Sequence, residues 1–178
     1  MIKTVTLTLV LFLALYFGTG GFLILQNDQT YEDLKATKVT ESNKQDIVVG
    51  MQNIVDEQTA IEAIYPYILA LPTVLSFLIT SICFGIIGSI AKIVNDTIQS
   101  KKKITATVNL LLIPIQGGLI GIIILGISYA LPVLLTNENI SLKPISIVFL
   151  SLFGGVYYQN FYSRFLKIVN SIGPADKD

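Results

Sequence analysis

Residues 110–135 of the chain read LLLIPIQGGLIGIIILGISYALPVLL, and they decide the class of fold. This stretch contains no charged side chain. A helix needs about 20 apolar residues to cross about 30 Å of bilayer hydrocarbon, and a straight helix of this length would extend about 39 Å. The stretch therefore predicts a membrane-spanning helix that tilts, protrudes or bends at Pro114 or Pro132.

The composition of the rest of the chain agrees with a membrane protein. Of the 178 residues, 52% are hydrophobic and 13% are charged, whereas soluble domains carry roughly 25% charged residues. Mean hydropathy is +0.69. The 12 basic and 12 acidic side chains cancel, so the overall charge does not predict a nucleic-acid partner.

Three further apolar runs, 5–25, 65–91 and 145–162, predict three further spans. The first run is longer than the 7 to 15 residues of a signal-peptide core, which favours an uncleaved span over a signal peptide. We expect Pro72 to kink the second span, because proline removes a backbone donor. The fold class predicted is an all-α, polytopic, four-transmembrane-helix bundle, with spans at about 4–26, 64–92, 108–135 and 144–162.

The basic residues predict how the spans are oriented. Eight of the 12 fall at the N-terminus, around the bend 93–107 or in the tail 163–178: Lys3, Lys92, Lys101, Lys102, Lys103, Arg164, Lys167 and Lys177. The loops 27–63 and 136–143 hold the other four. Because short loops rich in Lys and Arg stay in the cytoplasm, both termini are predicted to be cytoplasmic in a cell (plasma) membrane.

The Lys101, Lys102 and Lys103 triplet is explained by this topology alone. The alternative is contact with anionic lipid headgroups, which attract such clusters by about 1 kcal/mol per charge.

Two amphipathic helices are predicted outside the spans. A helix from about Asn43 places Ile47, Met51, Ile54 and Ile61 on one face, Ser42 and Gln45 resemble a capping box, and the helix can run straight into the second span. Its acidic residues favour a solvated face over a cation site. In the tail, an apolar row alternates with Arg164 and Lys167, which predicts a short helix along the membrane surface: Phe161, Phe165, Ile168, Val169 and Ile172.

The residue types exclude several chemistries. The chain has no histidine, and its single cysteine, Cys83, lies in an apolar run, so neither a His/Cys metal or haem site nor an internal disulfide is expected. None of the four apolar runs contains Asp, Glu, Lys, Arg or His, although proton-coupled transporters normally need such a residue in a span. We therefore expect no enzyme activity and no cofactor.

Small residues recur at four-residue spacing, which allows helices to approach closely. These rows predict packing seams that either close the bundle or drive oligomerisation: Ser81, Gly85 and Ser89; Gly117 and Gly121; Gly126 and Ala130; Ser151 and Gly155. Gln116 is interpreted as a hydrogen-bonding residue between helices or towards the carbonyl freed by Pro114, with pore lining as the alternative.

Three functions remain open from the sequence. The first is a non-enzymatic protein that acts by helix association, as an accessory or anchoring subunit of a membrane complex or as a homo-oligomer, with the lipid bilayer and a protein partner or second copy as its partners. The second is a pore-forming or membrane-permeabilising effector, of a bacterial defence or phage type, lined by Gln116 and by hydroxyls of the second span. The third is a transporter of a neutral substrate that uses kinks at Pro72 and Pro114.

Overall fold

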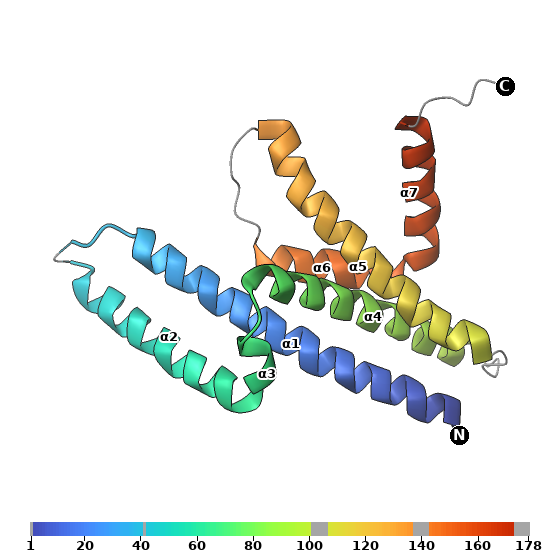
Figure 1. The fold of residues 1–178 in the computed structure, drawn as a ribbon, viewed down its shortest axis with the longest axis horizontal. Helices are drawn as coiled ribbons and strands as arrows, with labels where there is room; N and C mark the ends of the chain where they lie inside the picture. The colour runs from blue at the N-terminus through green and yellow to red at the C-terminus, as the bar shows by residue number, and fades with distance from the viewer. Residues whose placement is uncertain (1, 41, 101–106, 137–142, 173–178) are drawn as a thin grey trace.

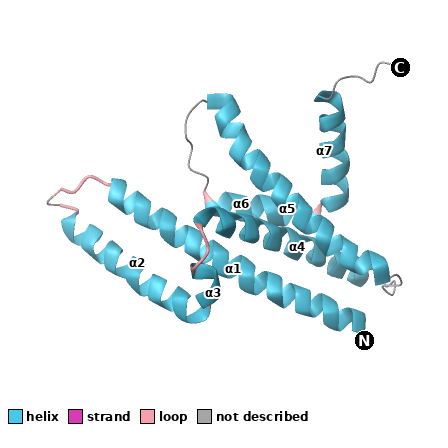
Figure 2. Ribbon diagram, viewed as in Figure 1, coloured by secondary structure: helices cyan, strands magenta, loops and turns pink. Residues whose placement is uncertain are grey.

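The computed structural model describes residues 2–40, 42–100, 107–136 and 143–172. Within these ranges the regular structure is entirely helical and no strand occurs, which confirms the prediction of an all-α fold (Figure 2). The helices are α1 (Ile2–Ala36), α2 (Lys44–Ile64), α3 (Pro66–Leu69), α4 (Thr73–Ser100), α5 (Thr107–Thr136), α6 (Pro144–Val156) and α7 (Tyr158–Ile172) (Figure 1).

Three of these helices are long and apolar enough to cross a membrane: α1 over Thr4–Ala36, α4 over Thr73–Gln99 and α5 over Leu112–Ala130. The fourth predicted span, 144–162, is divided between two helices, because Tyr157 leaves the helical conformation with φ −99° and ψ 27°. Apolar α6 has 13 residues and extends about 20 Å, less than the roughly 30 Å of hydrocarbon. A crossing by α6 therefore stays a prediction.

The central helix of the bundle is α4, which packs against α1 on one side and against α5 and α6 on others. Gly18 of α1 lies against Cys83, and Gly21 lies against Thr80, so α1 and α4 run antiparallel. Both glycines face α4 without a side chain of their own. The two helix axes can therefore approach closely.

The first helix extends further than the sequence indicates. Residues 27–36 were expected in a loop, yet they continue α1 without a break. The reason is the partner that covers them: α2 folds back along this half of α1, with Leu34 against Gly50 and Asn27 bonded to Gln58 (Figure 1). We call residues 27–36 of α1 together with α2 the arm.

The start of α2 lies where it was expected, but the capping box is wrong. Asn43 occupies the N-cap position and no side chain caps the helix. Asn43 instead closes the preceding loop: its Oδ1 accepts from the Thr40 N–H at 2.7 Å and its Nδ2 donates to the Lys38 carbonyl at 2.9 Å. Ser42 shares a hydroxyl contact with Thr40 at 3.0 Å.

The second span begins later than its predicted start at residue 64. The chain leaves α2 at Tyr65, forms the single turn α3 and enters α4 at Thr73. Pro72 does not kink a continuous helix, as was expected, but precedes the first turn of α4, where its carbonyl accepts from the N–H groups of Leu75 and Ser76. A proline at this position costs α4 no internal hydrogen bond.

The turn between α2 and α3 lies beside the apolar part of α1. The Tyr16 hydroxyl donates to the Ile64 carbonyl at 3.0 Å, and the hydroxyls of Thr19 and Tyr65 lie 3.0 Å apart. Around them Ile24, Ile61 and Ile68 form a buried cluster. The arm therefore reaches back to about the midpoint of the uncharged run 5–25.

Candidate functional site

The small-residue rows meet at one place in the bundle, between α4, α5 and α6. A Cβ atom on Gly85 would collide with the Gly117 carbonyl, and one on Gly155 would collide with the Gly85 carbonyl. A Cβ on Gly121 would likewise meet the Ser81 carbonyl. The three backbones touch directly because these positions lack side chains. We call this set the junction: Ser81, Gly85, Ser89, Gly117, Gly121, Ser151 and Gly155.

Two serine hydroxyls are hydrogen-bonded inside the junction. Ser81 Oγ donates to the Gly121 carbonyl at 2.6 Å and lies 2.7 Å from Ser151 Oγ. A hydroxyl has one proton, and a carbonyl only accepts, so Ser151 must be the donor in the second bond. Both serines are fully buried. The bonds link all three helices at a depth where water does not compete.

The junction places most of the predicted seams inside the bundle. Ser89 also belongs to it, with its hydroxyl donating to the Ile86 carbonyl at 2.8 Å. The row of Gly126 and Ala130 differs, since nothing lies within 4 Å of a Cβ built on Gly126 and Ala130 is exposed. The sequence left open whether the rows close the bundle or drive oligomerisation. These contacts favour closure of the bundle for every row except that of Gly126 and Ala130.

The other predicted site residues do not join the junction through their side chains. Gln116 is half-buried, and among the described residues it forms neither of the hydrogen bonds that we expected. Lys101, Lys102 and Lys103 lie outside the described residues.

Further hydroxyls of α4 are enclosed on the side of α1. Ser76 and Thr80 are 0% and 1% exposed, and neither hydroxyl has a hydrogen-bond partner among the described residues. Thr80 Oγ1 packs directly against Gly21. Together with Ser81, these are the hydroxyls proposed from the sequence as a pore lining, and in the chain they are covered by its own helices.

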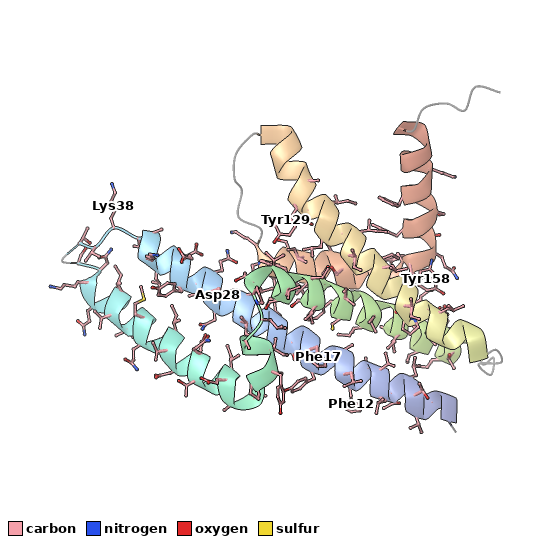
Figure 3. The ribbon with its side chains drawn as sticks, in the orientation of Figure 1. Phe12, Phe17, Asp28, Lys38, Tyr129 and Tyr158 are labelled. Carbon is pink, nitrogen blue, oxygen red and sulfur yellow. The ribbon has the colours of Figure 1, made fainter. Side chains whose placement is uncertain are left out.

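An acidic pocket of about 650 Å³ opens where the arm meets the bundle. Figure 3 shows Asp28 on α1 and Tyr129 on α5 at this end. Phe77 and Tyr129 meet edge to face with ring centroids 6.3 Å apart. Sequence reasoning missed the pocket because four helices contribute its lining: Leu25, Asp28, Gln29, Tyr31, Glu32, Asp33, Thr73, Phe77, Tyr129 and Pro144.

An apolar groove of about 410 Å³ lies between α5, α6 and the start of α7. Its lining consists of Ile124, Ile127, Ser128, Leu150, Phe153, Gly154, Tyr157 and Phe161. Only Ser128 and Tyr157 bring polar side-chain atoms to it, so the groove suits a hydrocarbon ligand better than a polar one.

No family model matches the sequence, and no curated protein or solved structure gives a significant match. Function is therefore argued from the chain's own geometry.

The side chains and contacts of the junction suit helix packing and not catalysis. A serine becomes a nucleophile when a neighbouring base accepts its proton, but the protons of Ser81 and Ser151 go to a carbonyl and to another hydroxyl. No group of three or more His, Cys, Asp or Glu side chains that could hold a metal ion is found in the described part of the chain. The junction can hold three helices in fixed register. Among the described residues, the arm, the acidic pocket and the apolar groove offer surfaces for contact with other molecules.

Proposed function

We propose that this chain is a non-enzymatic, multi-pass membrane protein that acts by association, as an accessory or anchoring subunit of a membrane complex or as a homo-oligomer. The seams were the first candidates for the contact surface. Because the junction uses them internally, the proposal assigns the contact to the arm.

The observation that carries the proposal is an exposed apolar flank of α2. Ile54 and Ile61 face α1 and are buried, whereas Val48 and Val55, which lie about a quarter of a turn to the side, are 64% and 58% exposed. These two valines are seven residues apart and therefore share one helix face. An exposed apolar stripe among polar residues is typical of a surface that another protein covers.

The orientation proposed for this protein follows the basic residues. It places four crossings in the plasma membrane, by α1, α4, α5 and α6, with both termini in the cytoplasm and the arm outside. In this arrangement α7 lies along the cytoplasmic surface.

Site-specific photocrosslinking tests the proposal. A photoreactive residue at Val55 should give an adduct of one discrete mass in cells, and the mass distinguishes a second copy from another protein. The matched control is Leu119, which is 52% exposed on α5 and should give no protein adduct. Absence of adducts from Val48 and Val55, with a strictly monomeric species in mild detergent, would contradict association.

The competing proposal is a pore or a transporter of a neutral substrate. It is favoured by half-buried Gln116, whose side chain has no hydrogen-bond partner among the described residues. Purified protein in liposomes decides between the two. Association predicts no release of a trapped dye and unchanged growth on overexpression. Leakage that disappears in the Gln116→Leu variant would favour the pore.

A further inference from the structure

The apolar groove opens on the outside of the bundle, at the depth of the spans. Ile124, Ile127 and Ser128 belong to the candidate membrane helix Leu112–Ala130. On α6, Leu150 and Phe153 are 53% and 56% exposed although they line the groove. A ligand in this groove would lie against hydrocarbon on its outer side, so the ligand itself must be largely apolar.

The end of the groove towards α7 has a different chemistry. After Tyr157 the chain turns, and α7 runs across the direction of α6 (Figure 1). Phe161 closes the groove and stacks on Phe165, with ring centroids 6.5 Å apart. Arg164 follows one turn later, about 4.5 Å further along the helix, and Lys167 follows after another turn.

The two basic side chains are exposed and have no acidic neighbour on their own helix. The sequence of α7, YQNFYSRFLKIVNSI, contains neither Asp nor Glu. The two ion pairs seen in the described part of the chain, Lys35 with Glu32 and Lys92 with Asp96, lie elsewhere. An apolar groove that ends beside two cations without an ion-pair partner among the described residues matches a ligand with a hydrocarbon chain and a negatively charged head.

We propose that this groove binds one acyl chain of an anionic phospholipid, with its phosphate held by Arg164 and Lys167. The inference rests on the membrane insertion assumed under the proposed function. Charge complementarity selects the lipid over an apolar partner helix, because a helix would fill the groove but leave both cations unpaired. A bound lipid would also fill the space between α6 and α7 and so hold α7 across the bundle.

The chain contains no tryptophan, so a single engineered one reports its own surroundings. Phe153→Trp places it in the groove, and Phe12→Trp is the matched control on α1, where Phe12 is 67% exposed (Figure 3). Each variant is reconstituted in phosphatidylcholine vesicles with increasing fractions of phosphatidylglycerol that carries bromine on its acyl chains. Bromine quenches tryptophan on contact.

The control should be quenched in proportion to the mole fraction of brominated lipid. The groove variant should show a preference for the brominated anionic lipid of at least about fivefold over the control, since each basic residue near the headgroups contributes severalfold. In the Phe153→Trp background, Arg164→Gln with Lys167→Gln should abolish this preference. Lys38→Gln, which removes a charge from the loop between α1 and α2, should leave it unchanged.

Three outcomes would overturn the lipid site. Equal quenching of the two tryptophans would show that the groove holds only bulk lipid. Weaker quenching at Phe153→Trp than at Phe12→Trp would show that protein covers the groove. If the preference for the anionic lipid persists without Arg164 and Lys167, these residues do not hold its headgroup. If Phe12→Trp itself is not quenched, the chain is not inserted in the bilayer, and the proposed function fails. Failure of the lipid site alone would leave Phe12→Trp quenched.

Discussion

The hydroxyl oxygens of Ser81 and Ser151 lie 2.7 Å apart although the two residues are 70 positions apart in the sequence. Ser81 belongs to the first half of α4, and Ser151 belongs to the middle of α6. Their hydrogen bond fixes the register in which α6 lies along α4, and the second bond from Ser81 to Gly121 adds α5. The packing of this bundle is thus specified by polar groups that are hidden from both lipid and water.

Removal of either serine hydroxyl should weaken the bundle. Ser81→Ala leaves the Ser151 hydroxyl and the Gly121 carbonyl without this partner, and Ser151→Ala removes one bond only. A double-mutant cycle should give a coupling energy of about 0.6 kcal/mol and not above about 1.7 kcal/mol, the range for hydrogen bonds between membrane helices. The free energy of unfolding is measured in mixed micelles. A coupling energy of zero would contradict the bond.

Added volume at the junction should be more harmful than volume elsewhere on the same helices. Gly85→Ala places a methyl group against the Gly117 carbonyl, where only backbone can give way, so we expect a loss of about 1–3 kcal/mol in unfolding free energy. The matched control is Gly126→Ala, where the space is open and alanine favours the helix by up to about 1 kcal/mol. Equal thermal stability of the two variants would refute the junction.

The arm should loosen when Asn27 is shortened. Asn27 is 5% exposed, and its Nδ2 donates to Gln58 Oε1 at 2.7 Å. Asn27→Ala removes this bond between α1 and α2, so amide hydrogen exchange over residues 54–64 should become faster. Thr30→Ala serves as the control, because that hydroxyl bonds only within α1, to the Gln26 carbonyl at 2.9 Å. Unchanged exchange in Asn27→Ala would show that the bond between Asn27 and Gln58 does not hold the arm.

The location of the C-terminus decides whether α6 crosses the membrane. With four crossings, a reporter fused after Asp178 should report cytoplasm, and a tag near Glu41 should report the exterior. With three crossings, the two reporters would lie on the same side. A Cys83→Ala background with a cysteine at Gln52 or at Gln99 tests the proposed orientation of α4 separately: an impermeant maleimide applied to intact cells should label only the Gln52 position.

The sequence was sufficient to predict the helices but not their ends. Apolar runs without charge predicted α1, α4 and α5, because a backbone in hydrocarbon must satisfy its own hydrogen bonds. The helical extension 27–36 could not be seen, since it depends on the partner helix that folds back on it. The break at Tyr157 was also missed, although Gly154 and Gly155 precede it and glycine weakens a helix.

The candidate site was predicted in part. Four-residue spacing identified the small residues that meet at the junction, because spacing places them on one face of each helix. It could not show which face of α4 meets α5 and which meets α6, nor that Gly126 would be left open. The acidic pocket and the apolar groove combine residues from several helices, so no local pattern marks them.

The return of the arm to Tyr16 constrains the order of biogenesis. If α1 spans the membrane as proposed, the Ile64 carbonyl and the Tyr65 hydroxyl meet their partners on a helix that already lies in the lipid phase. In the proposed orientation, the nascent chain would deliver residues 44–64 across the translocon, and their last turn would then pack beside α1 before α4 is in place. A variant that delays this step would leave an intermediate whose helices span the membrane but are not fully packed. Quality-control proteases could cleave this intermediate at the turn that precedes Pro66.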